Sequence, residues 1–312
     1  MDSEQWLRSP EDAYAEWQRA EATGADRRAF AEQSIVQHLS MFRRLNRYLI
    51  AHRSNVVAFG VDHIDRFFAE LDGSCRSGTS TRQRYLKLID RLARHLIALE
   101  LRTDNPASSL LSSERWPEDE PAPVFLGSAD DVRLQSACAV RAFDSFKELR
   151  NASIVAFLLG TGLTAAELRA LVVEDLDASS SRMSVFVKKH GPRIARRVPV
   201  DAFAVDLLRL YQSTRAGMSC PAQWLFVSTA NGTPMKTDRL GEYVRQALHH
   251  AQISAPDESP RLLRNTFGRR HLIDGMSNEQ VSNLLGLSSH RTVNRLRQTF
   301  DDEKIATPDG SG

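Results

Sequence analysis

The sequence predicts a mainly α-helical protein of two domains, with a small β-sheet or hairpin in the second domain. Apolar residues recur at three- and four-residue steps along most of the chain, which is typical of amphipathic helices. An acidic stretch with three prolines, 112–127, separates two such regions and is typical of a linker. Alternating, β-branched segments at 183–189 and 193–200 flank the turn residues His190, Gly191 and Pro192, and this pattern predicts a hairpin.

The first predicted domain, 34–111, is an all-helical bundle. Residues 34–52 carry one apolar stripe and residues 61–71 a second. The loop 73–80 is rich in Gly and Ser, and a hydroxyl residue at its end can cap a long helix that runs to about Leu99. Residues 1–33 are acidic and are predicted to form an extension ahead of the bundle.

The second predicted domain, 128–300, begins at the helix start SADDV and is followed by a polar tail, 301–312. The strongly apolar segment NASIVAFLLGTGL predicts a helix that ends at Gly160 or Gly162, and TAAELRAL predicts the start of the next. After the hairpin, further helices are expected at 201–215, 237–251, 261–274, 278–286 and 289–300.

The formal net charge of +2 conceals a segregated distribution. Residues 182–200 contain six Lys and Arg and no acid, and residues 261–297 contain seven Arg against two acids. Gathered basic charge indicates a surface that binds a polyanion. Three widely spaced cysteines fit neither a disulfide framework nor a zinc site, and neither a secretory signal nor a membrane-length apolar run is present. A cytoplasmic protein without metal or other cofactor is therefore expected.

Five motifs occur in order along the chain. A helix with the pattern Ser-Thr-x-x-x-Tyr ends in NPASSL, and TGLTAAEL, VKKHGPRIARRVPV, RLLRNTFGRRHL and LLGLSSHRTVNRL follow. Together they resemble the tyrosine recombinase (phage integrase) family over about 34–300. The resemblance implies a helical, SAM-like core-binding domain followed by a tyrosine-recombinase-like catalytic domain, with double-stranded DNA as the partner.

In that family a tyrosine hydroxyl attacks a DNA phosphodiester, and two arginines and a histidine or tryptophan stabilise charge on the phosphate. A lysine and a second histidine assist proton transfer. Carried over position by position, the motifs leave only Arg264 and a hairpin lysine, Lys189 (Lys188 if the hairpin aligns one residue earlier). The remaining positions hold other residues: Thr164 stands at the first arginine, Arg261 and Leu287 stand at the two histidines, and Leu296 stands at the tyrosine. Since Leu296 stands at the nucleophile position, the resemblance implies that the chain has lost cleavage activity.

Neighbouring residues offer few replacements for these groups. Arg169 lies five residues after Thr164, so on a helix it points about 140° away. His290 is one turn beyond Leu287 and could swing in. Tyr243 is the last tyrosine and precedes the Arg264 motif. Thr164 is itself explained by a capping box with Glu167.

DNA binding needs no catalytic arrangement, because phosphate contacts come from Arg, Lys and backbone groups. The candidate contact residues are Arg43, Arg44, Arg47, Arg82, Arg84, Lys87, Lys188, Lys189, Arg193, Arg261, Arg264, Arg269 and Arg270. The leading hypothesis is a DNA-binding accessory or regulator of recombination or integration of a mobile element, with an active recombinase as partner. Two alternatives stay open: a divergent active recombinase whose nucleophile is relocated or supplied in trans, and a helical interaction module that does not bind DNA.

Overall fold

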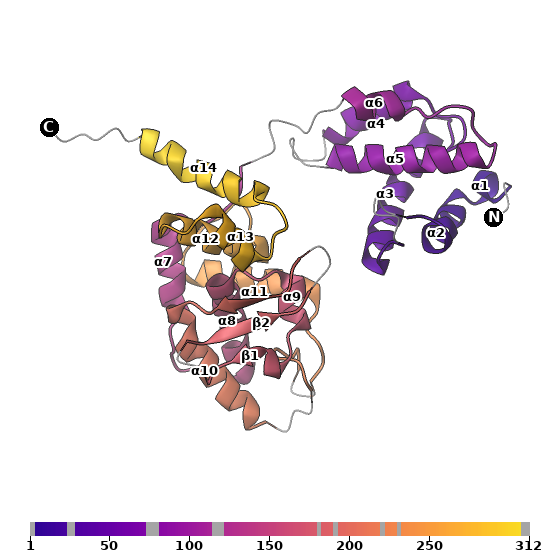
Figure 1. The fold of residues 1–312 in the computed structure, drawn as a ribbon. Helices are drawn as coiled ribbons and strands as arrows, with labels where there is room; N and C mark the ends of the chain where they lie inside the picture. Colours follow the sequence, from indigo (N-terminus) through magenta and orange to yellow (C-terminus); the bar gives the residue numbers. More distant parts are fainter. Residues whose placement is uncertain are drawn as a thin grey trace. The chain divides into compact units, whose positions relative to one another are not determined.

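The computed structural model describes residues 4–23, 29–72, 81–113, 122–179, 182–189, 193–218, 222–229 and 232–306. The chain divides into two compact units, Met1–Pro121 and Ala122–Gly312 (Figure 1). The boundary falls inside the linker expected at 112–127. Each unit is described by itself.

The first unit is helical, as predicted. Its helices are α1 (Gln5–Arg8), α2 (Pro10–Ala20), α3 (Glu32–Ala51), α4 (Val61–Asp72), α5 (Thr81–Ala98) and α6 (Ser108–Ser113). The predicted helices at 34–52 and 61–71, and the long capped helix, correspond to α3, α4 and α5. Their apolar stripes meet in one core, in which Phe42, Phe68 and Leu92 are buried. The loop 73–80 lies outside the described residues.

The acidic N-terminal residues belong to this core. Trp6 of α1 and Tyr14 of α2 are buried. The Tyr14 ring stacks on Phe42 of α3 with centroids 4.1 Å apart, and α2 packs along α3. The structure therefore corrects the expected extension 1–33, because α1 and α2 are part of the first domain. In the sequence, the many charged residues of α1 and α2 obscure the short aromatic face that packs into the core.

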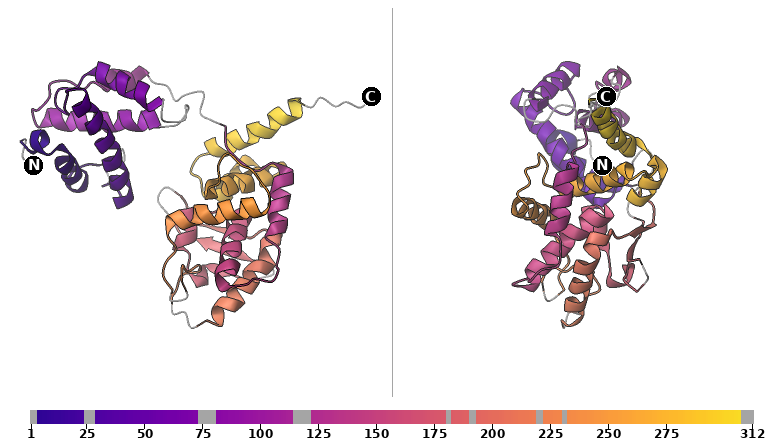
Figure 2. Two further views of the ribbon diagram at one scale, coloured as in Figure 1. Left: turned by 180° about the vertical axis from the view of Figure 1, so that it is seen from behind. Right: turned by 90° about the vertical axis from the view of Figure 1, so that its left-hand side faces the viewer.

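The second unit surrounds the buried helix α8 with helices and one small sheet, and Figure 2 shows from two further directions that helices make up most of it. Its elements are α7 (Ser128–Ala137), α8 (Phe146–Thr161), α9 (Ala165–Ala170), the 3-10 turn η1 (Val173–Asp175), β1 (Leu176–Asp177), β2 (Ser184–Val187), β3 (Arg196–Pro199), α10 (Ala202–Ala216), α11 (Thr237–His250), α12 (Pro260–Ile273), α13 (Asn278–Leu285) and α14 (Arg291–Ala306). Helix α8 packs against α10, α11 and α12. The antiparallel sheet has the order β1-β2-β3, with Val185 opposite Val198.

The predicted hairpin is confirmed in β2 and β3, although its tip, 190–192, lies outside the described residues. Strand β1 was not predicted, because two residues are too short to show an alternating pattern. Helix α14 runs six residues beyond the expected end at 300, through Ala306, and Figure 1 shows its end projecting from the unit. Residues 307–312 of the expected tail lie outside the described residues.

Candidate nucleic-acid interface

The motif TGLTAAEL forms a tight turn between α8 and α9. Gly162 ends α8 in the left-handed region at φ 63°, and a Cβ there would lie 2.4 Å from Phe267 of α12, so only glycine fits. Thr164 caps α9: its hydroxyl accepts from the Glu167 amide at 3.3 Å, and the Thr164 amide donates to the Glu167 carboxylate at 2.8 Å. The predicted capping box is confirmed.

Glu167 also holds the β-hairpin. Arg196 of β3 lies 2.8 Å from the Glu167 carboxylate, and the two side chains are 5% and 0% exposed. The Arg196 Nε donates to Leu284 O at 2.6 Å, which ties β3 to α13. Burial alone would raise the pKa of Glu167, but hydrogen bonds from Arg196 and Thr164, together with the Arg196 charge, hold that pKa below its usual range.

Arg264 of α12 joins the same network. Its Nη1 donates to Gly162 O at 2.6 Å and its Nη2 donates to Leu285 O at 2.7 Å, while Nη1 lies 3.9 Å from the Glu167 carboxylate. Burial lowers the pKa of Arg264 to about 10, the charge of Glu167 opposes this, and the charges of Arg193 and Arg196 add to it. Arg264 therefore stays protonated at neutral pH and fastens α12 to the ends of α8 and α13.

Arg193, Arg196 and Arg264 form what we call the guanidinium cluster. Its members are electrostatically coupled, since the first two lower the pKa of the third. Glu167 is the carboxylate that Arg196 and Arg264 share. The Arg193 Nε and the Arg196 Nη2 are buried and have no hydrogen-bond partner among the described residues. Buried donors without partners cost free energy, so the cluster favours an anionic ligand that accepts from them.

Leu296, at the expected nucleophile position, lies in the hydrophobic core. Its side chain is fully buried on α14 and belongs to the same cluster as Leu285 and Phe267. A Cβ on Gly268 of α12 would lie 3.2 Å from Leu296 Cδ1, so α14 packs closely on α12. No reactive group can be presented to a substrate from this side chain.

The structure also places the other positions at which the resemblance implied catalytic groups. Arg261 is exposed in the first turn of α12, and Leu287 is half-buried after α13. His290 does not take over from Leu287, because its Nδ1 lies 2.8 Å from the Ser282 hydroxyl. Arg169 Nε donates to Met235 O at 2.6 Å, in keeping with the expectation that it points away from Thr164.

All five tyrosines of the chain are buried. Their exposed fractions range from 1% to 8%, for Tyr14, Tyr48, Tyr85, Tyr211 and Tyr243. The Tyr243 hydroxyl accepts from Arg150 Nη2 at 3.3 Å. None of the five tyrosines is an exposed residue, and none lies on α14, where the family motif places the nucleophile.

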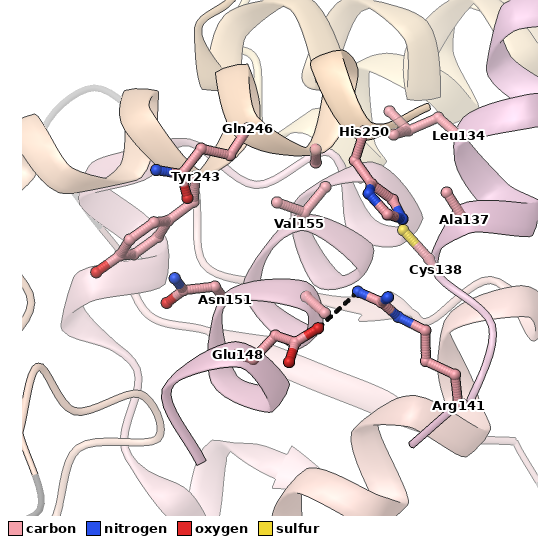
Figure 3. A pocket seen from close by; sticks show the side chains of 12 residues that line it. Leu134, Ala137, Cys138, Arg141, Glu148, Asn151, Val155, Tyr243, Gln246 and His250 are labelled. Carbon is pink, nitrogen blue, oxygen red and sulfur yellow. Dashed lines mark ion pairs between the residues drawn. The ribbon is translucent and has the colours of Figure 1, made fainter. Parts of the chain in front are cut away.

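A pocket of about 230 Å³ between α7, α8 and α11 contains another potential nucleophile, Cys138 (Figure 3). Burial raises the pKa of the Cys138 thiol to about 12, so the thiolate is scarce at neutral pH. Arg141 and Glu148 face each other at one side of the pocket, 3.0 Å apart. Its lining residues do not include the guanidinium cluster.

The hairpin lysines are exposed. Lys188 Nζ lies 3.2 Å from the Asp175 carboxylate, and Lys189 follows at the end of β2. Both could reach a phosphate from the surface, Lys188 by exchanging Asp175 for it.

Two arginines of α12 have internal roles instead. Arg269 is 4% exposed and lies over the Phe125 ring at 4.4 Å. Arg270 binds both oxygens of Asp131 at 2.8 Å and also pairs with Asp201. We therefore withdraw Arg269 and Arg270 from the DNA-contacting set, because their charged groups hold the fold together.

The basic candidates of the first unit are exposed on α3 and α5, namely Arg43, Arg44, Arg47, Arg82, Arg84 and Lys87. Arg43 Nε lies 3.2 Å from the Glu11 carboxylate of α2, so the Arg43 guanidinium already forms an ion pair within the first unit. The guanidinium of Arg82 lies over the Phe68 ring at 4.8 Å.

Sequence reasoning missed Arg196, although the motif Arg-x-Val-Pro contains it. Its buried position on β3 and its pairing with Glu167 depend on long-range packing that a single sequence does not reveal.

Comparisons with known proteins agree with this architecture. The model of the phage integrase family matches residues 132–303. The protein belongs to the phage integrase family. The tyrosine recombinase XerD of Yersinia pestis is 26% identical over 288 residues, which cover 87% of this chain and 91% of XerD. The tyrosine recombinase XerC of Pelobacter propionicus is 27% identical, with 82% of this chain and 84% of XerC covered.

Solved structures of this family share the fold. A post-cleavage complex of XerH with a palindromic difH substrate superposes with a TM-score of 0.71, at 15% identity, over 97% of this chain and 83% of the other. The integrase of transposon Tn1549, in complex with transposon right-end DNA, gives a TM-score of 0.69, at 16% identity, over 98% and 100%.

Among the described residues, no helix combines the length and apolar character that crossing a membrane requires. No three His, Cys, Asp or Glu side chains within the described ranges gather as around a metal ion.

Proposed function

We propose that this protein binds double-stranded DNA without cutting it, as an accessory or regulatory subunit in recombination or integration of a mobile element. Its partner would be an active tyrosine recombinase that binds the same or adjacent sites. The observation that carries the proposal is the burial of Leu296 at the expected nucleophile position, together with the burial of every tyrosine in the chain.

The replaced catalytic positions support the loss of cleavage. A covalent 3′-phosphotyrosyl link needs an accessible tyrosine hydroxyl. Thr164 serves as a helix cap in place of a phosphate-binding arginine, and the loss of one such preorganised donor costs on the order of 10²–10³ in rate. Without a tyrosine at the nucleophile position, the remaining cations can bind a phosphate, but no hydroxyl is positioned there to attack it.

The guanidinium cluster supports continued DNA binding. It places Arg196 and Arg264 beside one carboxylate and Arg193 close enough to act on Arg264. Two of its buried guanidinium nitrogens lack hydrogen-bond partners among the described residues. A backbone phosphate supplies the oxygen acceptors that such nitrogens need. The exposed Lys188, Lys189 and Arg261 extend this basic surface.

The decisive experiment mixes purified protein with nicked suicide duplexes taken from the ends of the element that carries the gene. The same samples are run on native and denaturing gels. A native shift that disappears on denaturation is expected. A band that survives denaturation would show a covalent link and would refute the loss of the nucleophile.

The matched variants are Arg193→Ala and Arg270→Ala. Arg193 has a buried nitrogen without a partner among the residues that the structure describes, so its loss should weaken the native shift with little effect on folding. Arg270 is held by Asp131, so its loss should act on folding instead. Adding a partner recombinase tests supply in trans, because the covalent link would then form on the partner's tyrosine. Cleavage at a site that the partner cuts only when this chain is present, and that is lost with Arg264→Ala, would refute a purely non-cleaving role.

A further inference from the structure

Tyr48 in α3 carries a buried hydroxyl whose role the fold does not explain. The residue is 6% exposed, and its ring lies 5.1 Å from that of Phe67 in α4 and 4.1 Å from that of His52. The hydroxyl is fully buried yet has no hydrogen-bond partner among the described residues. Buried tyrosine hydroxyls usually have a partner, so an external acceptor is the simplest explanation.

This side chain lines a hollow of about 320 Å³ on the first unit, between α3 and α4. Arg44 and Arg47, also on α3, line the same hollow. Arg44 precedes Tyr48 by four residues, which places both on the same side of the helix. The hollow therefore combines two exposed cations with one buried hydroxyl.

The chemistry of the lining selects the ligand. Two guanidiniums and a hydroxyl offer hydrogen-bond donors to an anionic oxygen. The opposing charge is Glu70, which also lines the hollow and whose carboxylate lies 3.6 Å from His52 Nε2. The two guanidiniums outnumber this one carboxylate, so the lining keeps a net positive charge. A backbone phosphate offers only acceptors to this donor set, and phosphate and sugar groups take about half to two-thirds of all protein–DNA hydrogen bonds.

We propose that this hollow holds one backbone phosphate of bound DNA, with Tyr48 as a hydrogen-bond donor beside Arg44 and Arg47. The inference rests on the DNA binding proposed above and adds a neutral contact residue that the charge pattern of the sequence did not indicate. Tyr48 would thus contribute to binding while adding nothing to the stability of the free protein.

The variant Tyr48→Phe separates these two effects. It removes only an unpartnered hydroxyl, so the unfolding temperature should stay the same or rise. DNA affinity, measured with a random-sequence duplex and the full-length protein, should fall about 10-fold, as expected for a hydrogen bond to a charged group. The salt dependence of affinity should not change, because no charge is lost.

Two comparison variants complete the test. Arg47→Ala should weaken binding and reduce the slope of log affinity against log salt by about 1. Tyr211→Phe makes the same chemical change in the second unit, where the hydroxyl donates to Leu225 O at 3.0 Å. Tyr211→Phe should therefore lower the unfolding temperature and leave DNA affinity unchanged.

The outcomes distinguish the hollow from the proposed function. If the wild-type protein has no salt-sensitive affinity for DNA, the proposed function fails, and the hollow with it. If the wild type binds and Tyr48→Phe binds equally well, only the hollow is refuted. A lower unfolding temperature of Tyr48→Phe would reveal an internal partner and also refute it. If inorganic phosphate stabilises the wild type but not Tyr48→Phe, while both bind DNA equally, the hollow holds free phosphate and the DNA contact is refuted.

Discussion

Replacement of Glu167 by glutamine tests the charge balance of the guanidinium cluster. Glutamine keeps the shape of the side chain and can still accept from the Thr164 amide, so the change isolates the carboxylate charge. Glu167 and Arg196 are 0% and 5% exposed and lie 2.8 Å apart. Loss of one partner of such a buried pair destabilises a fold by about 3–5 kcal/mol, because it leaves an uncompensated cation.

The expected effect is large enough to measure by thermal unfolding. For a domain of this size, each kcal/mol shifts the unfolding temperature by about 2–4 °C, so Glu167→Gln should unfold roughly 10 °C lower. DNA affinity of the folded variant should be equal or higher, since Arg196 and Arg264 then face no carboxylate. The control is Glu148→Gln, whose pair with Arg141 is much more exposed and contributes under about 1 kcal/mol.

The pH dependence of stability is a second test of the contribution that the Glu167 carboxylate makes. The folded pKa of Glu167 lies below its usual value. Its contribution to stability is therefore fully present above the unfolded pKa of about 4.3 and is lost as pH falls through the folded pKa. The gap between wild type and Glu167→Gln should narrow below about pH 4. If the two proteins unfold at the same temperature at neutral pH, Glu167 does not compensate the cluster and the reasoning is wrong.

Four other changes give separate tests. Arg193→Ala should reduce the salt slope of DNA affinity by about 1, with an unchanged unfolding temperature. Arg270→Ala should cost about 3–5 kcal/mol of stability and leave the salt slope of the folded protein unchanged. Gly286→Ala should lower the free energy of unfolding by about 1–3 kcal/mol more than Gly275→Ala does. Both glycines have positive φ, but only a Cβ at Gly286 would lie 2.4 Å from Arg196 Nη1. Trp6→Ala should cost about 3–5 kcal/mol in denaturant unfolding, and a smaller loss than about 1 kcal/mol would contradict the placement of α1 in the core.

Periodicity predicted the fold where each element has a clear apolar pattern. Helices α3 and α5 and the β2-β3 hairpin follow directly from three-to-four-residue and alternating spacings. Helices α1 and α2 were not predicted, because α1 has four residues and the aromatic face of α2 lies among acidic side chains. Strand β1 escaped because it consists of two residues.

The candidate site was predictable only as a set of motifs. Local chemistry predicted the Thr164 cap, since the capping partner is three residues away. It could not separate surface arginines from buried ones. Arg270 and Arg193 are both arginines in basic segments, and only the tertiary fold places Asp131 beside the former and leaves a buried nitrogen of the latter without a partner.

Under the proposed loss of cleavage, the burial of Leu296 also bears on whether a single substitution could restore the nucleophile. A tyrosine at this position would bring a larger ring and a hydroxyl into a core where α14 lies close to Gly268. Such overpacking costs about 1–3 kcal/mol, and an unpartnered hydroxyl adds about 1–3 kcal/mol. A single reversion would thus lower stability before it gave any activity, since Thr164, Arg261 and Leu287 would still lack the accompanying groups. The packing of α14 on α12 therefore favours retention of Leu296.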